Sequence, residues 1–353
     1  MPVISRELLR ALPKAELHCH LDGSVRAETM LELAHEYGRT MPVDDPDALR
    51  EHMVVKDAHN LEEYLERFTI TLSVMQRAEA IERIAYELAA DAAHDGVRYL
   101  ETRYAPVLNT QEGLSLDEAV EAAARGLARA EREHDIVARI IVCGLRHLEP
   151  AVSLRLAKLA VSHRERGVVG FDLAGGERGH PASLHAEAFA YARQHDLAVT
   201  VHAGEGDGAD SVRQAVHLCG AHRLGHATRL IEDESLTHYV NDRRIALEVC
   251  LTSNVQTHAT ESFDAHPVRR YFDRGMNVVL NTDNRLMSGT TLTDEYLLAA
   301  RHHGFTFEEL ATVALNGFAS AFIPWEERVA LMERARGEIE ELRGSPASMR
   351  NEP

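Results

Sequence analysis

The chain has 353 residues, and its 38 lysines and arginines against 56 aspartates and glutamates give a formal net charge of −18. Because nucleic-acid binding needs a basic surface, this acidic balance indicates no nucleic-acid partner and favours a small neutral or cationic ligand. No run of about 18 apolar residues is present, the start of the chain lacks a secretory signal, and the cysteines form no Cys-x-x-Cys, so we expect no membrane span and a cytoplasmic location with reduced thiols.

The first predicted strand carries His18 and His20, and the Asp22-Gly23 turn follows it. Side chains alternate along a strand, so the two imidazoles point to the same face, where both can bind one divalent cation. A chain with 21 histidines contains about one His-x-His by chance, so the spacing alone also fits two structural histidines. The interpretation therefore depends on the later segments.

Between this strand and residue 96 the sequence predicts helices and no further strand. Helical periodicity covers Ala27–Tyr37, Leu61–Met75 and Ala80–His94, the last closed by Gly96. In Leu61–Met75 the apolar side chains recur every three or four residues, which is typical of a helix that packs against a core.

From residue 97 onward, strand and helix patterns alternate. Further strands are predicted over Val97–Tyr104, Ala138–Leu145, Val168–Leu173, Ala198–His202, Arg223–His226, Ile245–Cys250 and Met276–Asn281. Helices are predicted over Leu116–His134, Ser153–Arg166, Ser183–His195, Ala209–Cys219, Glu232–Asn241 and Asp264–Arg274, and beyond the last strand. This alternation favours an α/β fold, a (β/α)8 TIM-type barrel with a helical insertion after the first strand and C-terminal helices. We expect one domain, residues 1–343, and a flexible tail, 344–353. A doubly wound open sheet is the alternative, although no Gly-x-Gly-x-x-Gly follows the first strand.

Polar side chains stand at the ends of these strands, where barrel enzymes carry their chemistry. The residues at or just after strand ends are His18, His20, His202, Glu205, His226, Ser253, Asp283 and Asn284. Their convergence on one mouth is the main signal, because a single histidine at such a place is more often structural. One set, His18, His20, His202 and Asp283, suits one Zn²⁺ with a position open for water, although ligand type alone leaves another divalent metal open.

The remaining polar residues fit hydrolysis at such a centre. Zinc lowers the pKa of a bound water to about 7. Asp283 is placed to accept a proton from this water or to orient the resulting hydroxide. Glu205 lies just beyond a ligand without binding the metal, which fits a general acid. His226 is placed to stabilise charge on the attacking oxygen, and Gly175 and Gly204 indicate backbone close to a ligand.

Several segments together resemble the adenosine deaminases of the metal-dependent amidohydrolase superfamily. These segments are Leu12-Pro13-Lys14-Ala15-Glu16-Leu17-His18-Cys19-His20-Leu21-Asp22-Gly23-Ser24, Asp172-Leu173-Ala174-Gly175, His202-Ala203-Gly204-Glu205, Leu224-Gly225-His226 and Asn281-Thr282-Asp283. They occur in the family's order and span about residues 12–290.

The resemblance implies zinc-dependent hydrolytic deamination of adenosine and 2′-deoxyadenosine to inosine and 2′-deoxyinosine with release of ammonia, a reaction of purine salvage. One Zn²⁺ per chain would be held by His18, His20, His202 and Asp283, and His20 would also border the substrate. Glu205 would protonate the purine N1, and His226 would hold the attacking oxygen. The Gly175 N–H would meet N3, Asp22 would bind the ribose 5′-hydroxyl, and the helix with Leu61, Tyr64 and Leu65 would cover the nucleoside.

Three positions depart from the family pattern. The family usually has Asp-Asp-Pro where this chain has Asp283-Asn284-Arg285, and the second Asp must be protonated to donate a hydrogen bond to purine N7. Asn284 donates from its amide without proton uptake, so we expect purine recognition to survive. Ala105 stands in place of a frequent Ser, and Gly176-Glu177 in place of Asp-Glu, which leaves the fine substrate choice open.

Other functions remain alternatives. The substrate could be adenine or another modified 6-aminopurine nucleoside, although relatives acting on free adenine tend to carry Glu at the position of Asp22. A two-metal amidohydrolase is disfavoured because Val168–Leu173 lacks the usual bridging lysine. A non-catalytic nucleoside-binding protein would not need Glu205.

Overall fold

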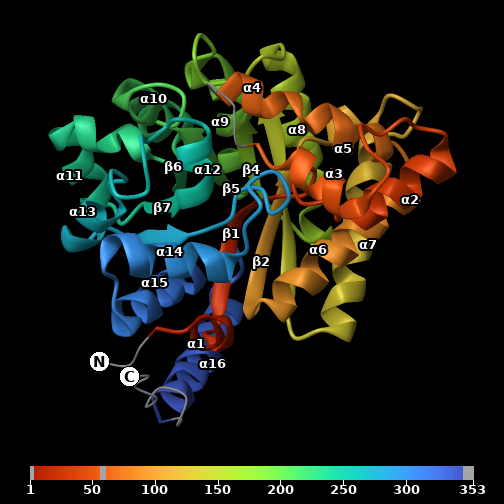
Figure 1. Cartoon of the computed structure of the whole chain (residues 1–353). Helices are drawn as coiled ribbons and strands as arrows, with labels where there is room; N and C mark the ends of the chain where they lie inside the picture. The colour runs from red at the N-terminus through yellow and green to blue at the C-terminus, as the bar shows by residue number, and fades with distance from the viewer. Residues whose placement is uncertain (1–3, 56–60, 345–353) are drawn as a thin grey trace.

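Eight parallel strands form the centre of the molecule, which we describe from a computed structural model over residues 4–55 and 61–344 (Figure 1). The strands are β1 (Lys14–His20), β2 (Val97–Tyr104), β3 (Val137–Leu145), β4 (Val168–Ala174), β5 (Ala198–Ala203), β6 (Arg223–His226), β7 (Ala246–Val249) and β8 (Val278–Leu280). They follow one another in chain order, each parallel to the next. A parallel bridge between Cys19 and Asp283 joins the segment after β8 to β1. The predicted (β/α)8 barrel is confirmed, and the open doubly wound sheet is excluded.

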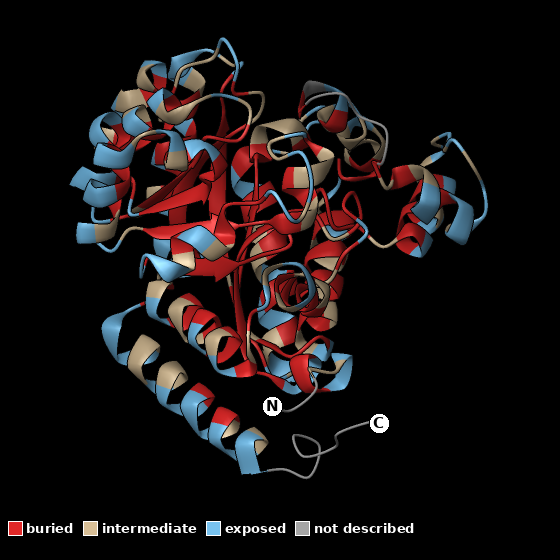
Figure 2. Ribbon diagram, turned by 60° about the vertical axis from the view of Figure 1, so that its left-hand side comes forward, coloured by how far each residue is buried: buried red, intermediate tan, exposed pale blue. Residues whose placement is uncertain are grey.

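The strands are buried on both faces, as Figure 2 shows by colour. Helices cover their outer side, which is why the strands are near-continuous apolar runs. The outer helices are α6 (Ala78–His94), α7 (Leu116–Glu133), α8 (Pro150–Ser162), α9 (Ala186–Gln194), α10 (Ala209–Gln214), α11 (Glu234–Asp242), α12 (Leu251–Gln256), α13 (Val268–Asp273), α14 (Leu292–His303), α15 (Phe307–Ser320) and α16 (Trp325–Gly344). Short turns of other helix types lie at Pro106–Asn109, Arg164–Arg166, Ala182–His185, Ala215–Cys219 and Thr228–Glu232.

The starts of several outer helices follow directly from the sequence. Capping boxes open α7, α14 and α15, where Ser115, Thr291 and Thr306 each accept a bond from the third helical residue, whose carboxylate reaches back to the cap. The predicted Asp264–Arg274 helix was too long, because α13 starts only after Pro267. Likewise, the first turn of the predicted Ser183–His195 helix belongs to a separate short helix.

The insertion after β1 covers one end of the barrel. It contains α2 (Ala27–Tyr37), α3 (Pro46–Met53), α4 (Leu61–Glu66) and α5 (Phe68–Val74), while α1 (Arg6–Ala11) precedes β1. The prediction of one helix over Leu61–Met75 was wrong, because the segment turns at Arg67, and α3 was not predicted. In Figure 1, α4 lies at the barrel end opposite to α1 and α16.

The C-terminal helices close the other end of the barrel. Phe318, Ala335 and neighbouring apolar residues pack against Leu17, Tyr99 and Val279 from the strands. Within residues 4–55 and 61–344, no helix has both the length and the apolar character needed to cross a membrane. Nearly all of the predicted tail lies outside the described residues.

Candidate active site

A cavity of about 190 Å³ lies at the C-terminal end of the strands, beneath α4. It gathers most of the residues singled out from the sequence: His20, Asp22, Leu61, Tyr64, Leu65, Gly175, His202, Glu205, His226, Asp283 and Asn284. His18 does not line the cavity and lies fully buried next to its floor. Residues from opposite ends of the chain meet here because every parallel strand ends at the same mouth.

Imidazoles and one carboxylate converge on the cavity floor. His20 Nε2 lies 3.1 Å from His202 Nε2, and Asp283 Oδ1 lies 3.3 Å from Nε2 of both His18 and His20. By mutual distance alone, His18, His202, His226 and Asp283 offer ligand atoms within 4.8 Å of one another. A candidate metal site is therefore present, with more nitrogen donors than a single tetrahedral ion needs.

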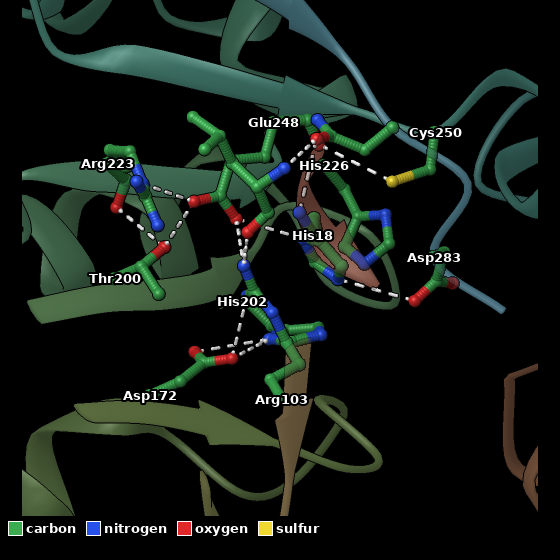
Figure 3. A network of polar contacts seen from close by, with 12 residues as sticks. His18, Arg103, Asp172, Thr200, His202, Arg223, His226, Glu248, Cys250 and Asp283 are labelled. Atoms are coloured by element: carbon green, nitrogen blue, oxygen red, sulfur yellow. Dashed lines mark hydrogen bonds and ion pairs between the residues drawn. The ribbon is translucent and has the colours of Figure 1, made fainter. Parts of the chain in front are cut away.

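Buried carboxylates orient two of these rings (Figure 3). His18 Nδ1 lies 2.9 Å from Glu248 Oε2, and His202 Nδ1 lies 2.9 Å from Asp172 Oδ2. Each carboxylate holds the Nδ1 proton and leaves Nε2 with a free lone pair turned to the centre, as in metal-binding histidines. His18 Nε2 makes no hydrogen bond among the described residues, which fits a nitrogen that binds a cation.

One arginine holds both of these carboxylates. Arg103 on β2 donates to Asp172 at 2.8 Å and to Glu248 at 2.9 Å, and all three side chains are fully buried. Arg223 adds a further bond of 2.6 Å to Glu248. No role was predicted for Arg103 or Glu248; for Glu248 a charged residue inside the otherwise apolar β7 is a signal, whereas β2 carries several charged residues and does not single out Arg103.

The carboxylate of Asp283 is held in its ionised form. Ser253, which follows β7, donates a hydrogen bond of 2.6 Å to Asp283 Oδ2. Burial on its own would raise the pKa of Asp283, but the adjacent imidazoles of His18, His226 and His20 hold it well below its usual range. Asp283 therefore acts as an acceptor.

Glu205 has the opposite protonation state. Burial raises its pKa well above the usual value, and the charges on Asp283 and Glu177 raise it further. Its Oε1 accepts a hydrogen bond of 3.0 Å from Thr257, and its Oε2 lies 3.4 Å from His226 Nε2. Burial therefore favours the protonated form of this carboxyl, which can donate its proton into the cavity.

A second glutamate fixes the loop that carries Glu205. The carboxylate of Glu177 accepts backbone N–H bonds from Gly204 at 2.7 Å, Glu205 at 2.9 Å, Gly206 at 2.7 Å and Asp207 at 3.1 Å. Gly204 has φ +74°, which other residues rarely adopt, so the tight turn after β5 depends on this glycine. The sequence analysis did not foresee this role of Glu177.

Two polar side chains in the cavity wall have oxygen atoms without a hydrogen-bond partner within the described part of the chain. They are Asp22 Oδ1 and Asn284 Oδ1. Burial raises the pKa of Asp22 to about 7. Tyr64 on α4 bonds Ser288 at 3.0 Å and ties this helix to the segment after β8. Because buried polar atoms rarely stay unpaired, the Asp22 oxygen indicates a polar ligand in the cavity, whereas Asn284 Oδ1 packs against Gly23.

Comparisons with known proteins identify the family of this chain. The sequence model of the family "Adenosine deaminase" matches residues 13–337. An adenosine deaminase of Mycobacteroides abscessus is 42% identical, over 91% of this chain and 93% of that protein. A probable adenosine deaminase of Dictyostelium discoideum is 45% identical over 91% of this chain, which spans 42% of that longer protein.

Solved structures with the same fold include two deaminases and a zinc-bound amidohydrolase. An adenine deaminase from Arthrobacter aurescens has a TM-score of 0.87 at 26% identity, covering 94% of this chain and 99% of that one. An N6-mAMP deaminase from Arabidopsis has a TM-score of 0.84 at 29% identity, covering 94% of this chain and 99% of that one. An amidohydrolase from Burkhoderia ambifaria with bound Zn has a TM-score of 0.88 at 26% identity, covering 98% and 95%. The chain belongs to the adenosine deaminase family.

Proposed function

We propose that this protein is a zinc-dependent adenosine deaminase that converts adenosine and 2′-deoxyadenosine to inosine and 2′-deoxyinosine and releases ammonia in purine salvage. The single observation that carries the proposal is one cavity that places Glu205, whose burial favours the protonated form, near Asp283, whose carboxylate lies against the His18 and His20 imidazoles. Two neighbouring carboxyls with opposite protonation states supply both a proton donor and a proton acceptor for hydrolysis.

One Zn²⁺ per chain would be held by His18, His20, His202 and Asp283. His20 is preferred to His226 because its Nε2 points at both His202 and Asp283. His226 instead has Nδ1 occupied by Asn254 at 2.9 Å and Nε2 next to Glu205. When bound, zinc supplies a water whose pKa is lowered to about 7.

The chain's own side chains account for the proton transfers. Glu205 gives its proton to purine N1, which makes C6 more electrophilic, and His226 donates a hydrogen bond to the oxygen that attacks C6. Asp283 accepts a proton from that oxygen. Of the two protons of the consumed water, one leaves with the amino group as ammonia and the other restores Glu205, while N1 of the product keeps its proton.

The cavity wall would orient the nucleoside. The backbone N–H of Gly175 is assigned to N3, the amide of Asn284 to N7, and Asp22 to the ribose 5′-hydroxyl. Leu61, Tyr64 and Leu65 on α4 would cover the base and exclude water. The unpaired oxygen of Asp22 supports its assignment, because a hydroxyl can donate to it.

The cavity favours a nucleoside over a nucleotide. Among the described residues that line it, none is a lysine or arginine, whereas Asp22, Glu205 and Asp283 contribute carboxyls. A 5′-phosphate near Asp22 would find no cation to balance its charge. Arabidopsis proteins of the same fold bind IMP and GMP, so nucleotides are the class to test against.

The assay is the loss of adenosine's ultraviolet absorbance on addition of the purified, zinc-loaded protein. Glu205→Gln keeps the shape of the side chain but removes the acid, so we expect turnover to fall by about 10²- to 10⁴-fold while zinc and inosine still bind. Glu187→Gln, at an exposed position on α9, is the matched control and should be unchanged. Near-normal turnover by Glu205→Gln would refute the assigned role.

Substrate choice is tested with adenosine, 2′-deoxyadenosine, adenine and AMP side by side. We expect the two nucleosides to have the highest kcat/KM, since only they fill the cavity without placing a phosphate beside Asp22. A preference for adenine or for AMP would identify the chain as a deaminase of that other 6-aminopurine. Binding of adenosine without turnover would indicate a non-catalytic binding protein.

A further inference from the structure

We propose that Asn254 and His266 are positioning residues that determine which ring nitrogen of His226 carries the proton. They would hold that proton on Nε2, the nitrogen that faces the cavity. This inference rests on the proposed function, in which His226 donates a hydrogen bond to the attacking oxygen.

The three side chains form a buried row behind the cavity wall. Their exposed fractions are 1% for His226, 0% for Asn254 and 3% for His266. His226 Nδ1 lies 2.9 Å from Asn254 Nδ2, and Asn254 Oδ1 lies 3.1 Å from His266 Nε2. Such burial excludes competing water, so these bonds set the positions of the protons.

The direction of the row follows from its far end, where the donor is a backbone amide. Val268 N–H can only donate, and it bonds His266 Nδ1 at 3.1 Å. His266 Nδ1 is therefore an acceptor, and the single proton of the neutral ring sits on Nε2. Burial supports the neutral form, because it lowers the pKa of His266 to about 3.

Each bond then fixes the next one. His266 Nε2–H donates to Asn254 Oδ1, so the amide group of Asn254 faces His226. An amide NH₂ can only donate, so His226 Nδ1 accepts and the ring proton sits on Nε2. A protonated Nε2 donates to an oxygen and does not bind a metal, which distinguishes His226 from the imidazoles whose Nδ1 donates to a carboxylate.

This arrangement explains two features of the site. Oε2 of Glu205 lies 3.4 Å from His226 Nε2, and within the described part of the chain the ring is bonded from behind by the neutral Asn254 and not by a carboxylate. The cluster also holds four imidazoles, one more than the three that are assigned to zinc together with Asp283. The neutral asparagine assigns that extra imidazole to hydrogen bonding.

The decisive substitution is Asn254→Asp, which keeps the shape but replaces the donor with an acceptor. His226 Nδ1 must then donate, and Nε2 loses its proton and its ability to hold the attacking oxygen. We expect kcat to fall by about 10²-fold, the effect of losing one preorganised donor, with zinc content and inosine affinity unchanged. Asn277→Asp is the matched control, because this asparagine bonds Ser320 Oγ at the opposite end of the barrel.

A double variant separates this role from general damage to the fold. If Asn254 acts through His226, then Asn254→Asp combined with His226→Ala is no slower than His226→Ala alone. Additive losses in the double variant would overturn the proposal, as would wild-type kcat in Asn254→Asp. Should Asn254→Asp fail to fold, His266→Leu removes the far end of the row instead. It should lower kcat in the wild type but cause no further loss when combined with His226→Ala.

Ring protonation can be read directly by long-range ¹H–¹⁵N correlation spectra of the zinc-loaded, ¹⁵N-histidine-labelled protein. The His226 signals are assigned by their loss in His226→Ala. In the wild type we expect the His226 ring to carry its proton on Nε2 and none on Nδ1. In Asn254→Asp we expect the proton on Nδ1 instead. A protonated Nδ1 in the wild type would overturn the proposal. An absence of adenosine turnover in the wild type would instead refute the proposed function, while the spectra still test this inference.

Discussion

Asn284 occupies the space in which a side chain at Gly23 would lie. A Cβ built on Gly23 would meet Asn284 Oδ1 at 1.8 Å, so this glycine allows the close approach of the two segments. Gly23 follows Asp22 in the turn after β1, and Asn284 follows Asp283 after β8. The contact therefore fixes the side chain assigned to purine N7 next to the one assigned to the ribose.

The donor role of Asn284 predicts a specific pattern with a modified substrate. Asn284→Ala removes the donor and should lower kcat/KM for adenosine by about 5- to 150-fold, the effect of leaving one buried partner unpaired. 7-Deazaadenosine lacks the N7 acceptor, so the same substitution should change its kcat/KM little. Equal losses with both substrates would show that Asn284 does not act through N7.

Arg103 should be needed for the metal site although it touches neither metal nor substrate. Arg103→Met leaves the Asp172 and Glu248 carboxylates buried without their shared cation, so we expect a stability loss of about 3 to 5 kcal/mol. Looser orientation of His18 and His202 should weaken zinc binding by about 10- to 100-fold.

Chemical denaturation and a competitive zinc chelator measure these two effects. Arg103→Lys keeps the charge but can bond fewer partners. Its stability and its zinc affinity should therefore lie between those of the wild type and Arg103→Met. Zinc affinity equal to that of the wild type in folded Arg103→Met would contradict the assigned role.

Glu295 on α14 predicts a pH dependence of stability that is independent of catalysis. Burial raises its pKa from 4.5 to about 7, although hydroxyl groups of Thr252 and Thr290 bond it. Between pH 4.5 and about pH 7, Glu295 therefore holds a proton in the folded state that it has lost in the unfolded state. This contribution to stability is complete below pH 4.5 and is lost as the pH rises through 7.

This rise in pH should lower the free energy of unfolding by about 3 kcal/mol at most, and Glu295→Gln should abolish that part of the pH dependence. Urea denaturation of the zinc-loaded protein at about pH 5.5 and pH 8.5 should therefore show a smaller decline for this variant than for the wild type. Glu309→Gln is the control, because the pKa of Glu309 lies at about 2 and causes no change in this range. An identical decline in the wild type and Glu295→Gln would contradict the prediction.

The barrel could be predicted because short strand patterns, most of them rich in apolar or β-branched residues, alternate with helix patterns along the chain. Helix boundaries were predicted less accurately, because the spacing of apolar residues does not reveal where a local turn interrupts a helix. α3 has a good start signal in Asp45 and Pro46 but buries only Leu49 and Met53, so its periodicity is weak. α12 (Leu251–Gln256) begins right after the predicted strand Ile245–Cys250 and is too short to show helical periodicity, so it was not predicted.

Within the site, the sequence revealed the side chains that reach the cavity but not those that hold them. His202 and Glu205 stand at a strand end, where a functional role can be inferred from position. Glu177 acts by accepting four backbone N–H bonds, and a loop glutamate carries no sequence sign of that. Glu248 and Arg103 pair across the barrel interior, and only the closed fold brings them together.

Deamination should require one zinc ion at His18, His20, His202 and Asp283. The direct test removes the metal with a chelator, verifies its absence by elemental analysis, and follows adenosine absorbance while Zn²⁺ is added back. We expect no turnover in the metal-free protein and a linear recovery that ends at one equivalent of zinc per chain. Undiminished turnover by protein shown to be metal-free would contradict the account.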